Sequence, residues 1–116
     1  MMNKIEGKDT GYLFMGPLVE EMKKKVKKGV ILVDNHRTGV VMSDNPDSPW
    51  YQAAVYSHGS ILRDLKGNKI QEVALWEITD PEGDLSFVVY WNPPSEAASL
   101  HFVVGTGKWE GIAGSG

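Results

Sequence analysis

The chain has 116 residues, no cysteine and a formal net charge of −3, with 41% hydrophobic and 23% charged residues. This length fits one domain, the composition excludes a disordered chain, and the lack of cysteine excludes a disulfide framework, a thiolate metal site and a cysteine nucleophile. The charge is uneven, because residues 1–28 carry seven lysines and four acids, whereas residues 29–116 carry five basic and eleven acidic residues.

The first fifteen residues contain one apolar run, residues 12–15, which is too short for the core of a signal peptide or for a membrane span. An acidic body with one local basic run also argues against wrapping nucleic acid, which needs a broad basic surface. We therefore expect a cytoplasmic protein with no nucleic-acid partner and no membrane partner.

Residues 17–28 are predicted to form one short basic helix. Pro17 suits a first helical turn, two acids precede a run of lysines in the order that the helix dipole favours, and Gly29 can end the helix in a left-handed conformation. Apolar residues recur every four positions and form a narrow stripe. The stripe consists of Leu18, Met22 and Val26.

Beyond Gly29 the pattern changes to short apolar and β-branched runs separated by Gly, Asn, Asp and Pro, which predicts seven or eight strands. Asn35 is expected to begin a turn. The turns leave no room for crossover helices, so we predict an antiparallel meander that closes into a small barrel. The expected fold is mainly β, a single barrel domain over residues 1–116 with one N-terminal helix. The candidate strands are residues 30–33, 38–43, 50–57, 60–63, 69–79, 85–91 and 99–104, with a further candidate at 109–113.

Two segments imitate ligand-binding loops. Residues 104–108 read VGTGK, but Phe102 stands where a phosphate-binding loop needs glycine and Trp109 replaces the required Ser or Thr, so a tight turn is favoured. Residues 80–84 read DPEGD with acids at alternate positions, but no acid follows at position twelve, so a solvated turn is favoured over a calcium loop. The three histidines are scattered, and no metal site is predicted.

Alternation along two strands brings aromatic and ionisable side chains onto shared faces. In the first strand, one face carries Trp50, Tyr56 and His58. In the second strand, one face carries Glu72 and Trp76. Inside a small barrel such faces would suit a ligand pocket, where a desolvated carboxylate could act as a general acid or base. Glu77 competes with Glu72 for this role because a one-residue shift in register exchanges them. The alternative is that the tryptophans only pack the core while the His and Glu side chains face water.

Two motifs in the C-terminal half resemble those of a known family. Residues 76–84 read WEITDPEGD and residues 102–114 read FVVGTGKWEGIAG. They are similar to the D-x-x-G-D turn and the G-T-G-K-aromatic-x-G-I-x-G hairpin of allene oxide cyclase-like barrels and their bacterial relatives. The resemblance implies an eight-stranded barrel with an internal apolar cavity, often oligomeric. In this superfamily the plant enzymes cyclise a fatty-acid epoxide without a cofactor, and dirigent proteins steer radical coupling. No catalytic residue of the plant enzymes can be placed here by motif, and both the basic helix and the short C-terminus depart from the pattern.

We predict a barrel that binds a small apolar or amphipathic ligand, with no cofactor and no metal, and that forms a homo-oligomer. A cofactor-free isomerase or cyclase is the enzymatic variant. The alternative is a structural or protein-interaction module that forms a homo-oligomer without a ligand. The candidate ligand-binding residues are Trp50, Tyr56, His58, Glu72, Trp76, Trp91 and His101, and the catalytic candidates are Glu72, His58 and Tyr56.

Overall fold

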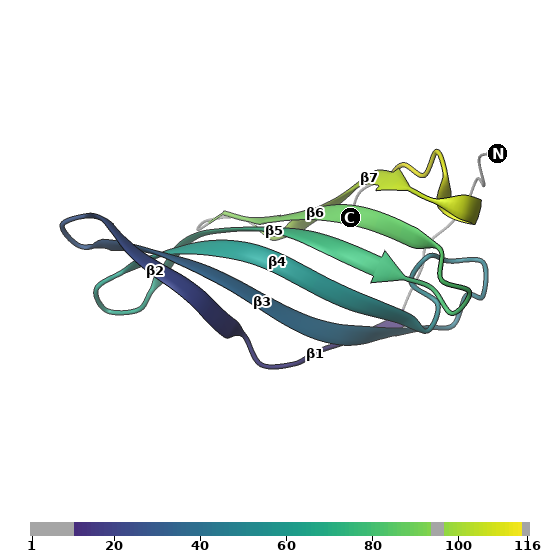
Figure 1. Ribbon diagram of the computed structural model, residues 1–116, viewed down its shortest axis with the longest axis horizontal. Helices are drawn as coiled ribbons and strands as arrows, with labels where there is room; N and C mark the ends of the chain where they lie inside the picture. Colours follow the sequence, from purple (N-terminus) through teal and green to yellow (C-terminus); the bar gives the residue numbers. More distant parts are fainter. Residues whose placement is uncertain (1–10, 94–96, 115–116) are drawn as a thin grey trace.

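In the computed structural model the chain forms one antiparallel sheet of seven strands, and the structure describes residues 11–93 and 97–114 (Figure 1). The molecule is elongated, with extents of 49 × 24 × 23 Å. The described residues contain no helix long and apolar enough to cross a bilayer. The elements are β1 (Gly11–Met15), β2 (Val19–Lys27), β3 (Val30–Ser43), β4 (Ala53–Asp64), β5 (Lys69–Thr79), β6 (Leu85–Asn92), β7 (Ser99–Gly105) and the short 3₁₀ helix η1 (Gly107–Trp109).

The sheet is an open meander. Its order is β1-β3-β4-β5-β6-β7, and β2 pairs with β3 beside β1. Strand β3 serves both partners because it is 14 residues long, pairing with β1 along residues 39–43 and with β2 along residues 30–36. Strands β1 and β2 thus share one edge of β3, and β4 pairs with its other edge. Among the described strands, β7 pairs only with β6. The antiparallel meander is therefore confirmed, whereas the predicted closure into a barrel is wrong.

The predicted helix at residues 17–28 is also wrong, because most of this segment is strand β2. Every residue of β2 is exposed, so a helix with its narrow stripe would have had no core to pack against. Pairing instead satisfies the backbone groups of the neighbouring half of β3. Gly29 adopts the expected left-handed conformation, with φ of +86°, but it does so in the tight turn from β2 to β3. Lysines are common on edge strands because they discourage further pairing.

Other predicted strands merge. Asn35 does not begin a turn, since it lies within β3 with its side chain buried. Residues 50–57 and 60–63 were expected as two strands, but Gly59 continues the pairing and β4 runs from Ala53 to Asp64. The predicted bounds of β5, residues 69–79, match the structure. The candidate strand at 109–113 is instead the end of η1 and a turn.

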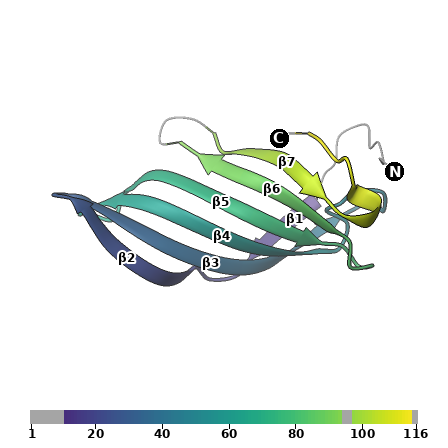
Figure 2. The same ribbon diagram turned by 45° about the horizontal axis from the view of Figure 1, so that its top comes forward.

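The core lies on one face of the sheet, which we call the inner face. Its central residues are Val41, Val55, Trp76, Ile78 and Val88, and all are buried. Alternation sends their neighbours to the opposite, outer face. The sheet curls enough that β1 passes behind β5 and β6 in Figure 2. The inner face is therefore a half-open trough and not the interior of a closed barrel.

Candidate functional site

Four aromatic rings form a cluster on the inner face. The Trp50 ring lies edge-on to the Trp76 ring, with centroids 6.3 Å apart and planes at 86°. Trp76 stacks on Tyr90 at 5.3 Å, and Trp50 contacts Phe102 at 5.7 Å. Trp50 belongs to the loop between β3 and β4, where its backbone N–H donates to the Ser48 hydroxyl at 3.0 Å. Strands β5, β6 and β7 thus each supply one ring, and a loop supplies the fourth.

The trough contains an apolar groove of about 220 Å³ beside this cluster. Leu13 on β1 and Leu100 on β7 both line the groove, so the curl of the sheet brings its first and last strands to one site. Ligand pockets usually measure roughly 300–1,000 Å³. The groove therefore fits a single ring or a short acyl chain. Its lining residues are Gly11, Tyr12, Leu13, Val41, Ser43, Trp50, Trp76 and Leu100.

A polar cluster surrounds Glu72, farther along the inner face. The Glu72 carboxylate is buried and accepts from Arg37 Nη2 at 3.5 Å and from Lys69 Nζ at 3.2 Å. With its amide oriented to satisfy its neighbours, Asn92 accepts from the Tyr90 hydroxyl at 3.2 Å and from the Lys69 ammonium group. Glu72 is therefore a carboxylate with two cationic partners and not an isolated carboxylate among indole rings. Tyr90 connects this polar cluster to the stacked aromatic rings.

Tyr56 and His58 lie on the outer face, away from Glu72 and Trp76. The buried residues of β4 are Ala53, Val55 and Ser57, so their alternates point outward. Tyr56 contacts His58 at 4.3 Å and stacks on His36 at 5.9 Å. The prediction that Tyr56 and His58 share one interior with Glu72 is wrong. It counted alternating positions from Trp50, but Trp50 lies in the loop before β4, so its direction says nothing about which β4 side chains point inward.

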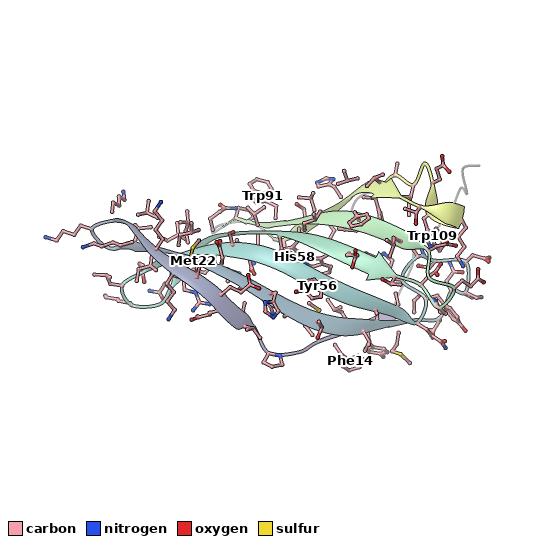
Figure 3. The ribbon with its side chains drawn as sticks, viewed as in Figure 1. Phe14, Met22, Tyr56, His58, Trp91 and Trp109 are labelled. Carbon is pink, nitrogen blue, oxygen red and sulfur yellow. The ribbon has the colours of Figure 1, made fainter. Side chains whose placement is uncertain are left out.

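The remaining predicted site residues, Trp91 and His101, are also exposed on the outer side. Trp91 projects away from the sheet (Figure 3). His36 and His58 are opposite each other in register, and His101 lies in the same row across β5 and β6. Even so, the part of the chain that the structure describes holds no group of three metal-ligating side chains.

Glu77, the competitor to Glu72, pairs opposite Tyr56 and so also belongs to the outer face.

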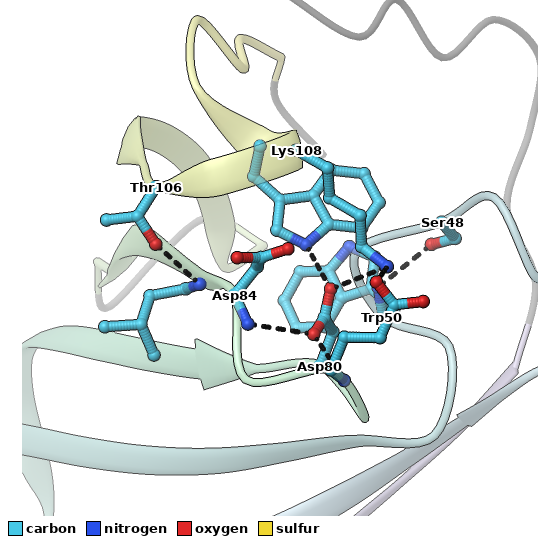
Figure 4. A network of polar contacts seen from close by, with 9 residues as sticks. Ser48, Trp50, Asp80, Asp84, Thr106 and Lys108 are labelled. Carbon is cyan, nitrogen blue, oxygen red and sulfur yellow. Dashed lines mark hydrogen bonds and ion pairs between the residues drawn. The ribbon is translucent and has the colours of Figure 1, made fainter.

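Asp80 forms a second polar site at the β5–β6 turn, which we call the Asp80 clasp (Figure 4). One oxygen, Oδ1, accepts the backbone N–H groups of Glu82 at 2.9 Å and Asp84 at 3.0 Å. The other, Oδ2, accepts from Trp109 Nε1 at 2.8 Å and pairs with Lys108 Nζ at 3.0 Å. Sequence reasoning missed this site, because it assigned residues 80–84 to a solvated turn while Asp80 is 5% exposed. The sequence feature that could have revealed it is the presence of both motifs, DPEGD and GTGKW, in one chain.

The clasp perturbs two ionisable groups. Burial opposes the ionisation of Asp80, but hydrogen bonds from Lys108, Trp109 and the two backbone N–H groups outweigh it and lower the pKa below the ordinary value of 3.8. The hydrogen bond to Asp80 raises the pKa of Lys108 above 10.5, against a smaller effect of burial. Both carboxylate oxygens already have donors, so the clasp holds the last loop to the sheet and is not built to receive a cation.

Two glycines of the GTGKW segment are required by close packing. A Cβ at Gly105 would lie 2.1 Å from the Trp109 carbonyl oxygen, and a Cβ at Gly107 would lie 2.0 Å from Asp84 Oδ1. Gly107 also has φ of +55°. Between them, Thr106 exchanges two hydrogen bonds with the backbone of Leu85 at 2.8 and 2.9 Å. The glycines therefore bring η1 against the β5–β6 turn and do not cradle a phosphate.

No protein-family model, no curated protein and no solved structure matches the chain. The resemblance to allene oxide cyclase-like barrels therefore remains an expectation based on two motifs. The structure gives these motifs a physical role, since DPEGD and GTGKW are the two halves of the Asp80 clasp.

Proposed function

We propose that the protein binds a small apolar or amphipathic ligand in the inner-face groove between β1 and β7. The observation that carries the proposal is a groove lined by Leu13, Leu100 and the Trp50–Trp76 pair, open to solvent at the trough. Aromatic and aliphatic walls with a few polar groups nearby are typical of small-molecule sites. The apolar part of the ligand would lie in this groove.

The polar end of an amphipathic ligand would point toward Arg37. Arg37 is opposite Ser57 in register, and Ser57 is opposite Trp76, so the guanidinium lies across the same inner face as the aromatic wall. A ligand carboxylate could pair with this cation, as Glu72 does. Tyr56 and His58 lie on the outer face, so they could not assist Glu72 in an isomerase or cyclase reaction. We therefore propose binding without catalysis.

The four tryptophan side chains provide a direct test of the groove. In ¹H–¹⁵N spectra, titration with toluene, phenol or hexanoate should shift the indole N–H resonances of Trp50 and Trp76. The resonances of Trp91, on the outer side, and Trp109, in the clasp, should stay in place. Each resonance can be assigned from a Trp→Phe variant. Shifts confined to Trp91, or no saturable shift with any of these probes, would contradict the proposed site.

Leu13→Ser should lower the affinity of the probe by at least about fivefold. The probe would lose part of its apolar contact with the Leu13 side chain, which weakens the binding free energy by about 1 kcal/mol. Leu13 is 46% exposed in the unbound protein, so the variant should still fold. Leu75→Ser is the matched control, because Leu75 is 43% exposed but lies on the outer face. Equal losses in both variants, measured by the same titration, would show that the probe binds nonspecifically to apolar surface.

A second candidate function is homo-oligomer formation through the outer face. Val73, Leu75 and Trp91 are large, apolar and substantially exposed there. Trp91 is opposite Val73 in register, so the two side chains form a continuous patch with Leu75 nearby. Contiguous exposed apolar surface of this kind commonly marks a protein interface.

If this patch joins two copies, the molar mass from light scattering should rise with protein concentration. Trp91→Ser should then shift the protein to the monomer, because large aromatic side chains dominate interface energies. Thr38→Ser, also an exposed outer-face position, should leave the mass unchanged. A monomer at every concentration of the wild type would contradict the oligomer, and the groove proposal would be unaffected.

A further inference from the structure

The positive charge of the chain is concentrated at one end of the molecule. Eight of its twelve basic residues fall in two short segments, residues 23–28 and 63–69, which contain only one acid, Asp64. The segments are adjacent in space because Val30, just after the β2–β3 turn, pairs with Asp64 at the start of the β4–β5 turn. We call residues 22–31 and 63–69 the basic tip, and both of its turns lie at the left end in Figure 1.

The opposite end of the molecule is acidic. It contains the β3–β4 loop, the β5–β6 turn and the segment around η1, which together carry five carboxylates besides the buried Asp80 and one lysine, Lys108. The long axis of the molecule measures 49 Å. At physiological ionic strength the Debye length is about 8 Å, so the acidic end is screened from anything that contacts the basic tip. The net charge of −3 therefore does not prevent this tip from approaching an anionic surface.

The lysines of the tip surround apolar side chains that are unusually exposed. Leu65, in the β4–β5 turn, is 72% exposed, and Met22 and Val26 on β2 are about half exposed. Met22 is visible on β2 in Figure 3. Lys24, Lys25, Lys27 and Lys28 form no ion pair with another described residue, while Lys23 pairs with Glu20. An open recess of about 300 Å³ is lined by Lys23, Lys24, Lys25, Lys27, Gly29, Val30, Ile31 and Leu65.

The turn that carries Leu65 has a fixed shape. The Asp64 carboxylate accepts the backbone N–H groups of Lys66 and Asn68, both at 2.9 Å, and the Asn68 side-chain amide at 3.2 Å. The Asn68 backbone hydrogen bond contributes most to lowering the pKa of Asp64, so this turn keeps its negative acceptor at neutral pH. Leu65 is thus presented to solvent by a hydrogen-bonded turn, together with Lys66.

We propose that the basic tip docks on the surface of an anionic phospholipid bilayer, with the lysines over the headgroups and Leu65 inserted at the boundary of the acyl chains. This proposal replaces the sequence-based expectation of no membrane partner, which considered only spanning segments. Lysines around exposed aliphatic residues fit such a surface, which combines negative charge with an apolar layer beneath it. A nucleic acid fits less well. The tip has no aromatic residue on which a base could stack and only one arginine, Arg63.

The test is cosedimentation of the full chain with phosphatidylcholine vesicles prepared with and without phosphatidylserine. We expect binding only to the vesicles that contain phosphatidylserine, and we expect it to weaken as sodium chloride is added. The double variant Lys24→Gln/Lys27→Gln should lower the partition coefficient about 25-fold, since each lysine near an anionic surface contributes about fivefold. Leu65→Ser should lower it by about tenfold through lost apolar insertion.

The matched control is Asn45→Asp/Gln52→Glu, which lowers the net charge by the same amount at the acidic end with nearly unchanged side-chain shape. We expect this control to bind vesicles like the wild type. Circular dichroism of each variant checks that the sheet is retained. Equal losses in the control and the lysine variant, or wild-type binding by Leu65→Ser, would overturn insertion of the tip. Tighter binding of the wild type to a short DNA duplex than to the vesicles, at the same salt concentration, would assign the tip to nucleic acid instead.

Discussion

Trp76→Ala is expected to lower the free energy of unfolding by about 3–5 kcal/mol, the usual cost of truncating a buried tryptophan. Trp76 is 7% exposed, and its ring is held between Trp50 and Tyr90. Removing it leaves a cavity that the flanking strands cannot collapse into, because both belong to the same hydrogen-bonded sheet. Urea unfolding followed by far-ultraviolet circular dichroism measures the change and avoids relying on tryptophan fluorescence.

Trp91→Ala provides the control with the same change in side chain. Trp91 is 45% exposed on the outer face, so the cost of its truncation should be about 1 kcal/mol or less. Because Trp76→Ala could leave too little folded protein to measure, Trp76→Phe supplies a milder variant that should lie between the two. If Trp91→Ala costs as much as Trp76→Ala, the assignment of the inner and outer faces of β5 and β6 is wrong.

Asp80→Ala should destabilise the protein by about 3 kcal/mol, because it deprives one buried and two partly buried donors of their acceptor, and each buried donor left unsatisfied costs about 1–3 kcal/mol. The donors are the Trp109 indole N–H and the backbone N–H groups of Glu82 and Asp84. Trp109 is itself buried, so water cannot easily replace the carboxylate. Chemical denaturation should show a lower midpoint with an unchanged slope.

Glu82→Ala is the control in the same turn. Glu82 also pairs with Lys108, at 3.3 Å, but its side chain is 72% exposed, and an exposed ion pair contributes about 1 kcal/mol or less. Trp109→Phe removes one donor and keeps a smaller aromatic ring in its place, so its effect should lie between those of the two acid variants. A similar loss for Glu82→Ala and Asp80→Ala would show that the clasp is a surface ion pair and not a buried hydrogen-bond network.

The clasp also predicts how stability depends on pH. The pKa of Asp80 is lower in the folded protein than its ordinary value of 3.8, so its contribution is present above pH 3.8 and is lost as the pH falls through the folded pKa. Lys108 has a raised pKa, so its contribution is lost as the pH rises above 10.5. Asp80→Asn should therefore flatten both limbs of a plot of unfolding free energy against pH. An acid limb as steep as that of the wild type would contradict the assignment.

Local sequence patterns predicted the three strands between residues 69 and 105 well, although not the end of the chain, where the candidate strand at 109–113 was wrong. The bounds of β5 follow from a run of alternating residues between two turn segments, and alternation correctly placed Glu72 and Trp76 on one face. The same reasoning failed at Asn35 and Gly59, which interrupt the pattern without ending their strands. These residues remain in strands because both neighbouring strands offer hydrogen-bond partners, which a single segment cannot reveal.

The helix at residues 17–28 was mispredicted because its order of charges and its apolar spacing are compatible with a helix, and only the long edge of β3 makes the extended conformation preferable. The facing of the candidate site residues was predicted in part. Trp50, Glu72 and Trp76 lie on the inner face, whereas Tyr56, His58 and Trp91 face outward. The register between strands decides on which face each side chain lies. The loop of residues 44–52 separates β3 from β4, so alternation cannot be counted from one strand into the next.

By itself the sequence determined an antiparallel meander of strands after Gly29 and the uneven charge that becomes the basic tip, because period, turn residues and composition are local properties. Only the tertiary structure decided that the sheet stays open, that Leu13 and Leu100 meet across one groove, and that Asp80 is buried beneath Trp109. Each of these depends on contacts between residues far apart in the chain. Such contacts are fixed by how the sheet curls and by which edge each strand occupies.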